Sequence, residues 1–210
     1  ADLTLGLPAG VTAATGIDAM VHAIESYTSK LKKNPMSDLL AREGLRLLSA
    51  NLRAVVDNGQ DREARQAMLF GACLAGQAFA NSPVAAVHAL AYPLGGHFHI
   101  PHGLSNALVL PHVLRFNASH AEALYAELAP LLLGDRLQPG SQASLCEQFI
   151  DELASLNQRC GLPSRLRDAG VPEDMLKQLA SDAMLQQRLL VNNPREVSEA
   201  DALAIYQAAY

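Results

Sequence analysis

The sequence lacks several features that would place a protein quickly in a class. It has no excess of positive charge, because 16 lysines and arginines stand against 21 aspartates and glutamates, so we expect no nucleic-acid partner. It has no apolar run long enough and free enough of charge to span a bilayer, so we expect no membrane partner. Its first ten residues lack the basic start and continuous apolar run of a signal peptide.

Cysteine is scarce and shows no paired spacing. The three cysteines, Cys73, Cys146 and Cys160, are an odd number without a CxxC motif. This usage is typical of reduced, mostly buried thiols. We therefore expect a cytoplasmic location rather than a disulfide-bonded secreted protein.

Alternating runs of β-branched residues are also missing, so no sheet is expected. A helical pattern is present instead along the whole chain. In residues 12–28 the apolar side chains recur every three or four positions, at Ile17, Met20, Val21 and Ile24. We predict an all-α, multi-helix bundle of roughly eight to ten helices.

Proline, glycine and capping residues predict where several of these helices begin and end. One helix is expected from Pro35, with Ser37 as its cap, to Asn58-Gly59. Another is expected over residues 84–94, with Pro93 causing a kink or lying near its first turn. Residues 1–210 are expected to form a single all-helical domain, with a sub-boundary in the loop 134–144, which is rich in Gly, Pro and Ser.

Histidine is scarce too, with 7 in 210 residues, yet three histidines lie together in the segment GGHFHIPHG at residues 95–103. His97 and His99 form an HxH pair, which binds metal in cupins from one face of a β-strand. That interpretation requires a β-barrel, and the helical pattern excludes it. His102 stands between Pro101 and Gly103 at the start of the next expected helix.

Three further residues could bind the same ion. Asp18 and His22 stand four positions apart in a predicted helix, which places their Cβ atoms about 5–6 Å apart on one face. They could hold a metal, or they could form an Asp–His hydrogen bond on the helix surface. His88 lies among apolar residues, where it could be a ligand or a buried core histidine.

Taken together, three segments resemble the iron-containing, group III alcohol dehydrogenases. These segments are TAATGIDAMVHAIESYTS (12–29), AAVHALAYPLGGHFHIPHGLSNALVLPHVLRFN (85–117) and LLVNNPREVSEADALAIYQAAY (189–210). The resemblance implies the C-terminal helical metal-binding domain of the dehydroquinate synthase-like fold. It also implies that the N-terminal nucleotide-binding domain of the family is absent from this chain.

The resemblance implies a complete set of metal ligands. Asp18 and His22 match the first ligand motif, His88 matches the VHxLxxP helix, and His102 matches the PHG motif. One carboxylate and three imidazoles suit Fe²⁺ and also Zn²⁺. Gly95-Gly96 and Pro101 should prevent one continuous helix, so that His88 and His102 approach the metal from two elements.

The implied activity is metal-assisted hydride transfer between an alcohol and its aldehyde or ketone. NAD or NADP would be bound mainly by the missing domain, so the 210 residues alone are expected to bind metal without turnover. Tyr92 stands where some relatives carry a histidine that faces the substrate, and Tyr92 and His99 are candidate catalytic residues. His97, His99 and Tyr92 are candidates for orienting the ligand imidazoles. Homo-oligomerisation is left open.

Three alternatives remain at this point. Maleylacetate reductases are similar, but they tend to carry Asn where Asp18 stands and LPHAETH where this chain has IPHGLSN, so Asp18, Gly103 and Asn106 favour the alcohol dehydrogenases. Dehydroquinate synthase-like lyases typically use a Glu with two His. A non-catalytic helical module would hold a structural metal in a closed site, whereas a catalytic metal lies open to a pocket.

Overall fold

The computed structural model describes all 210 residues and contains nine α-helices, four short 3₁₀ segments and no strand. The predicted all-α architecture is therefore confirmed. The α-helices are α1 (Ala9–Thr28), α2 (Pro35–Asp57), α3 (Arg62–Asn81), α4 (Ala86–Phe98), α5 (His102–Leu133), α6 (Gln142–Arg159), α7 (Leu176–Ala183), α8 (Gln187–Leu190) and α9 (Glu199–Ala209).

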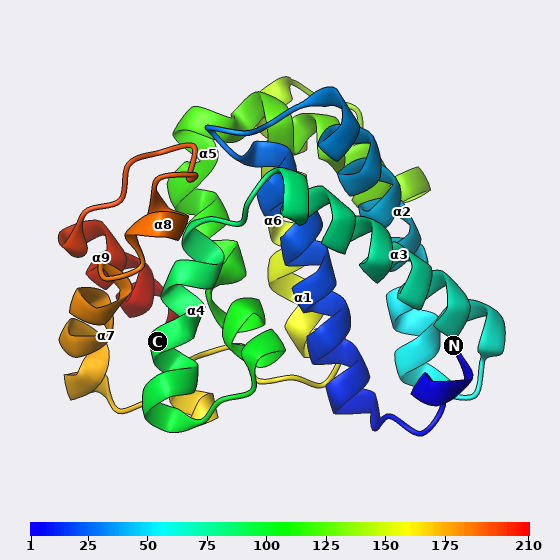
Figure 1. Cartoon of the computed structure of the whole chain (residues 1–210), viewed down its shortest axis with the longest axis horizontal. Helices are drawn as coiled ribbons and strands as arrows, with labels where there is room; N and C mark the ends of the chain where they lie inside the picture. Colours follow the sequence, from blue (N-terminus) through cyan, green and yellow to red (C-terminus); the bar gives the residue numbers. More distant parts are fainter.

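Helix α1 runs through the middle of the molecule (Figure 1). Helices α2 and α3 pack against each other and against α1, and α5 packs against α1 from another direction. Helix α4 lies on α5, α6 runs along α5, and the short helices α7 to α9 gather beside α4 and α5. This arrangement brings three segments that are far apart in the sequence, α1 and the beginnings of α4 and α5, into one region.

The buried apolar side chains form one continuous cluster of 55 residues, which runs from Ala13 to Ala209. It includes residues on both sides of the loop 134–144. The rings of Tyr125 and Phe149 stack across the α5–α6 contact, with their centroids 5.7 Å apart. The helices are therefore held together mainly by shared burial of apolar surface.

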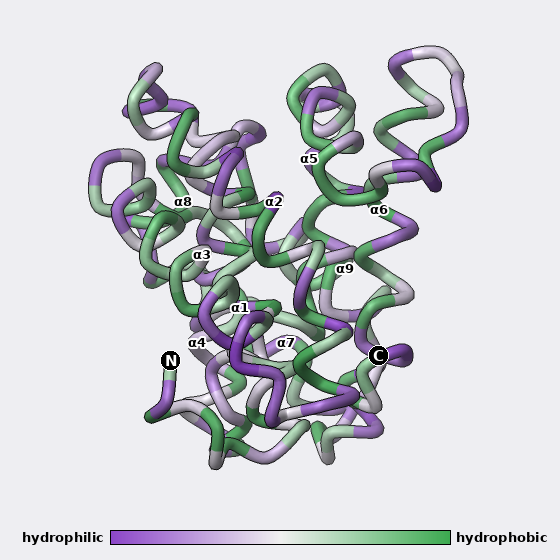
Figure 2. Tube along the Cα trace, turned by 90° about the vertical axis from the view of Figure 1, so that its right-hand side faces the viewer, coloured by the Kyte–Doolittle hydropathy of each residue, from purple (hydrophilic) through white to green (hydrophobic).

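Hydrophobic and hydrophilic residues are interleaved along the helices (Figure 2). No helix combines the length and the apolar character that crossing a membrane requires. Cys146 and Cys160 are buried, Cys73 is exposed, and none of them forms a disulfide. Burial raises the pKa of the Cys146 thiol to about 11, which keeps it protonated and unreactive.

The cap of α2 differs from the one expected. Asn34, not Ser37, is the N-cap, and its side chain accepts hydrogen bonds from the backbone N–H groups of Met36 and Ser37 at 3.1 and 3.0 Å. The Ser37 side chain accepts in return from the Asn34 N–H, which completes a capping box. Pro35 occupies the first helical position, where no N–H is needed, so the cap must lie before it.

The break between α4 and α5 also lies later than expected. Helix α4 continues through Gly95 and Gly96 to Phe98, because two helical glycines cost only about 1 kcal/mol each and the flanking Leu94 and Phe98 pack on the core. The chain turns at His99, whose φ of 55° is left-handed and whose N–H bonds to the Gly95 carbonyl at 3.1 Å. Pro93 lies inside the helix.

Candidate metal centre

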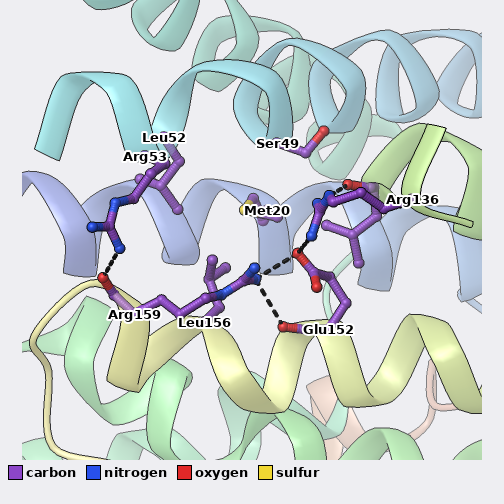
Figure 3. A pocket seen from close by; sticks show the side chains of 9 residues that line it. Met20, Ser49, Leu52, Arg53, Arg136, Glu152, Leu156 and Arg159 are labelled. Atoms are coloured by element: carbon purple, nitrogen blue, oxygen red, sulfur yellow. Dashed lines mark hydrogen bonds and ion pairs between the residues drawn. The ribbon is translucent and has the colours of Figure 1, made fainter. Parts of the chain in front are cut away.

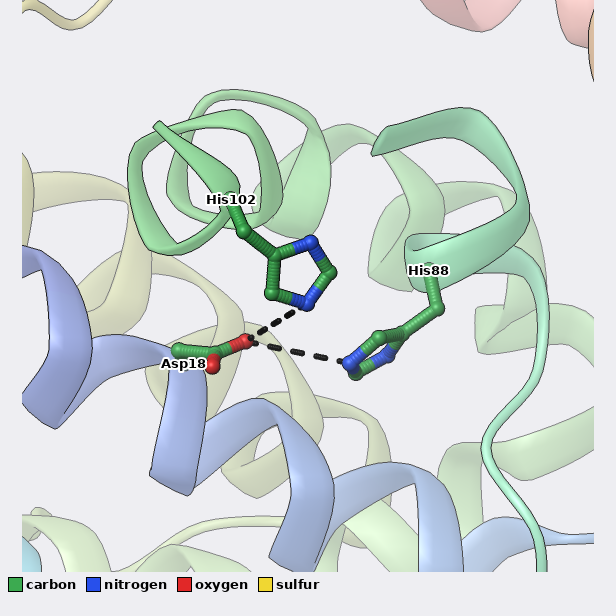
Figure 4. Close-up of side chains that lie close together, drawn as sticks. All are labelled: Asp18, His88 and His102. Atoms are coloured by element: carbon green, nitrogen blue, oxygen red, sulfur yellow. Dashed lines mark ion pairs between the residues drawn. The ribbon is translucent and has the colours of Figure 1, made fainter. Parts of the chain in front are cut away.

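Asp18, His88 and His102 meet at one point (Figure 4). The Asp18 Oδ1 atom lies 3.7 Å from His88 Nε2 and 3.6 Å from His102 Nε2. The three potential ligand atoms all lie within 4.8 Å of one another. Each residue comes from a different helix, namely α1, α4 and α5. An ion held here would tie these three helices together.

Exposure increases steadily across the three side chains. The His88 side chain is 2% exposed, that of Asp18 is 18% exposed and that of His102 is 47% exposed. The cluster therefore has a buried floor and an open side. A metal bound among these residues would remain reachable by a small molecule.

Close contact with α1 explains why a glycine, Gly103, follows the histidine in the PHG motif. A Cβ atom at this position would lie 2.5 Å from the Ala14 carbonyl oxygen, which is backbone and cannot move aside. Glycine therefore permits the start of α5 to approach α1 closely. That approach sets His102, the first residue of α5, beside Asp18.

The protein leaves bonding capacity unused in this cluster. Only four buried side-chain polar atoms lack a hydrogen-bond partner, and two of them, His88 Nε2 and Asn106 Oδ1, belong to this region. Asn106 Nδ2 lies 2.5 Å from Asp18 Oδ1 and 3.1 Å from His102 Nε2. A buried polar atom without a partner is costly, and a bound ion would satisfy His88 Nε2. The donor set of carboxylate and imidazoles fits a first-row divalent metal.

His22 lies beside the cluster without being a member of it. Its ring stacks between Phe79 and His88, with centroid distances of 4.6 and 4.8 Å. Burial lowers the pKa of His22, although Asp18 raises it in part. The lowered pKa favours the neutral imidazole, which is the form that binds metal.

Tyr92, His97 and His99 are the other predicted site residues, and only Tyr92 contacts the cluster. Its ring centroid lies 5.8 Å from that of His102 and 6.5 Å from that of His88. His97 Nε2 instead lies 2.6 Å from Asp182 Oδ2 on α7, and this hydrogen bond lowers the pKa of the Asp182 carboxyl. His99 is exposed at the end of α4.

Two residues of the site were not identified from the sequence as groups that hold the ligands. Asn106 lies one turn after His102 and contacts both it and Asp18. Glu25 lies seven positions after Asp18, on the same face of α1, and its Oε2 atom is 2.7 Å from His88 Nδ1. Spacings of four and seven residues on a helix were the available signals.

A pocket of about 480 Å³ opens beside the cluster and includes Asp18 and His102 in its wall. Most of its remaining wall comes from the beginnings of α1 and α5, and it is largely apolar. These wall residues are Pro8, Gly10, Val11, Ala14, Thr15, Pro101, Gly103, Leu104 and Leu162. A small organic molecule could reach the cluster through it.

A second pocket, of about 390 Å³, lies between α2 and α6 and contains none of the predicted site residues (Figure 3). Its charged side chains bind one another: Glu152 Oε1 accepts from Arg136 Nη1 at 2.8 Å and from Arg159 Nη2 at 2.5 Å. Arg53 pairs with Asp57 at 2.7 Å. This arginine pocket leaves no buried polar side-chain atom without a partner.

The chain is similar to a family of known proteins. Residues 12–210 match the family model described as "Fe-containing alcohol dehydrogenase family, C-terminal". Long-chain-alcohol dehydrogenase 1 of Geobacillus thermodenitrificans is 45% identical over 208 residues, which are 99% of this chain and 52% of that protein. The 1,3-propanediol dehydrogenase of Klebsiella pneumoniae is 39% identical, over 99% of this chain and 53% of that protein.

A solved structure of a 1,3-propanediol oxidoreductase has the same fold. It matches with a TM-score of 0.93 at 39% identity, over 98% of this chain and 53% of the solved one. The chain therefore spans about half the length of the curated relatives that it matches.

Proposed function

Because the chain belongs to the iron-containing alcohol dehydrogenase family, we propose that it is the metal-binding, catalytic half of an NAD(P)-dependent alcohol dehydrogenase. The reaction is hydride transfer between an alcohol and its aldehyde or ketone. The observation that carries the proposal is the cluster of Asp18, His88 and His102, with an unpartnered imidazole nitrogen, at the wall of an open pocket.

Asp18, His88 and His102 would hold the metal, which we propose to be Fe²⁺, with Zn²⁺ suited to the same donors. When bound, such an ion supplies a Lewis acid that lowers the pKa of a bound alcohol. We include His22 as the fourth ligand because its ring already stacks on that of His88. In this set Asp18 supplies the only negative charge, so it limits the excess positive charge in the cluster.

The other side chains of the site would bind and orient the substrate. The apolar wall of the open pocket excludes water around the carbon chain of an alcohol. The Tyr92 hydroxyl would orient the substrate oxygen, since its ring lies against that of His102. We assign no role to His99, because it is exposed and makes no hydrogen bond to the cluster.

The last part of the proposal concerns where the nicotinamide cofactor would be bound. No strand followed by a glycine-rich turn occurs within these 210 residues, so NAD or NADP would be bound mainly by other parts of the protein. The 210 residues alone should accordingly bind metal without catalysing the reaction. A cytoplasmic location belongs to the same proposal, in keeping with three free thiols.

The test is an assay of the complete natural protein for alcohol-dependent reduction of NAD⁺ and NADP⁺. Activity should disappear on removal of metal with a chelator, return with Fe²⁺ or Zn²⁺, and be lost in Asp18→Ala. Glu152→Gln, in the arginine pocket, is the matched control and should remain active. Full activity of the metal-free protein, or of Asp18→Ala, would refute the proposal.

A further inference from the structure

We propose that Glu25 is a positioning residue that holds His88 as the Nδ1–H tautomer and thereby keeps His88 Nε2 free to bind metal. The inference rests on the proposed function, because it concerns the same metal. It assigns a role to a buried carboxylate that is itself too far along α1 to be a ligand of the cluster. Glu25 is only 3% exposed and lies on the opposite side of the His88 ring from Asp18.

Both oxygens of Glu25 are occupied. Oε1 accepts a hydrogen bond from the Val87 N–H at 2.7 Å, and Oε2 lies 2.7 Å from His88 Nδ1. An ionised carboxylate can only accept hydrogen bonds, so the proton between Oε2 and the ring belongs to Nδ1.

The proton on Nδ1 determines the state of the other ring nitrogen. A neutral imidazole carries one N–H, so Nε2 of His88 then presents a lone pair. This lone pair faces Asp18 Oδ1, another acceptor, at 3.7 Å, and Nε2 has no hydrogen-bond partner. Two acceptors that face each other repel unless a cation lies between them. The Glu25–His88 bond therefore prepares the cluster for a cation.

Glu25 also has a structural role that must be separated from this one. The N-cap of α4 is Ala85, which has no side-chain acceptor, so the Glu25 carboxylate satisfies the free Val87 N–H at the start of that helix. Capping requires only one oxygen. Glu25→Gln keeps this oxygen but offers an N–H₂ group to His88, which would then accept at Nδ1 and carry its proton on Nε2.

The experiment combines ¹⁵N NMR of the histidine rings in the metal-free 210-residue chain with a Zn²⁺ titration of the same chain. Wild-type His88 should show the Nδ1–H tautomer. In Glu25→Gln the tautomer should change to Nε2–H, and Zn²⁺ should bind about 10–100-fold more weakly. Thermal unfolding measures any loss of the α4 cap separately.

The matched control is Glu127→Gln. Glu127 also binds a side chain of α1, accepting from the Tyr27 hydroxyl at 2.5 Å, but it contacts no histidine. It should change neither the His88 tautomer nor the Zn²⁺ affinity. If Glu25 served only to cap α4, Glu25→Gln would lower the stability of the chain without altering the His88 tautomer.

A proton on Nε2 in the wild-type chain would overturn the inference, and so would unchanged Zn²⁺ affinity in a folded Glu25→Gln. Should that variant fail to fold, the wild-type tautomer decides alone. Failure of the wild-type chain to bind Zn²⁺ would contradict the proposed function, whereas the tautomer would still show whether Glu25 orients the ring.

Discussion

The cluster of Asp18, His88 and His102 and the arginine pocket both border α1, but their polar groups differ in whether they have hydrogen-bond partners. In the cluster, His88 Nε2 is buried without a hydrogen-bond partner. In the arginine pocket, Glu152 binds both Arg136 and Arg159. Proteins usually satisfy buried polar groups internally. The two regions therefore differ in whether their polar groups bind one another, and this difference is the reason why we propose the first, and not the second, as a ligand site.

The largest expected effect is the loss of Zn²⁺ affinity on removal of a proposed ligand. Asp18→Asn should weaken Zn²⁺ binding by more than about 100-fold, because an amide oxygen is a far poorer ligand than a carboxylate and the charge is lost. Calorimetric titration of the 210-residue chain measures this change. Affinity equal to that of the wild type would show that Asp18 is not a ligand.

The next effect concerns the approach of two helices. Gly103→Ala should lower the free energy of unfolding by about 1–3 kcal/mol and also weaken Zn²⁺ binding, because the new Cβ would lie 2.5 Å from the Ala14 carbonyl oxygen. Urea denaturation and metal titration measure the two effects.

Gly76→Ala in α3 is the control for this prediction. A Cβ at Gly76 meets nothing within 4 Å, so the helical alanine should stabilise the chain by up to about 1 kcal/mol. If Gly103→Ala behaved like Gly76→Ala, the close contact between α5 and α1 would not be needed for the site.

A smaller effect concerns His112, a partly buried histidine that has no carboxylate partner. Burial, with a contribution from Arg115, lowers the pKa of His112 to about 4. Because the unfolded value is about 6.5, the unfolded chain takes up more protons between these values. The folded state should therefore lose stability as the pH falls from about 6.5 to about 4, by about 1–2 kcal/mol after allowance for partial exposure.

Urea denaturation across this pH range checks the His112 prediction. His112→Gln should remove this part of the pH dependence and leave Zn²⁺ affinity unchanged. An unaltered pH profile in the variant would show that His112 does not contribute it.

The smallest effect belongs to the arginine pocket. Glu152→Gln should change the free energy of unfolding by about 1 kcal/mol or less, because its partners Arg136 and Arg159 are 56% and 38% exposed and remain solvated. Zn²⁺ affinity should not change. A loss of metal binding in this variant would remove the distinction between the two regions.

Much of the fold was predictable because helical periodicity is a local property. The apolar spacing around Ile17 and Met20 predicts α1, and Pro35 and Asn58-Gly59 predict the two ends of α2. The end of α4 was not predictable in the same way. Gly95 and Gly96 favour a break, but they stay helical between Leu94 and Phe98, whose side chains pack on the core.

The site was predictable only in part. Asp18, His88 and His102 could be identified from their motifs, and the structure brings them together. Glu25 could not, because its contact with His88 spans 63 positions and depends on where α4 begins relative to α1. Proximity in sequence was misleading for His97, which binds Asp182 on α7.

Titration of the metal-free chain with Co²⁺, followed by visible absorption, decides whether Asp18, His88 and His102 bind a divalent ion. We predict saturation at about one equivalent per chain, with spectra typical of imidazole and carboxylate ligands, and loss of the signal in the double variant Asp18→Ala/His102→Ala. Absence of saturable binding, or an identical titration of the double variant, would contradict the assignment of the metal centre.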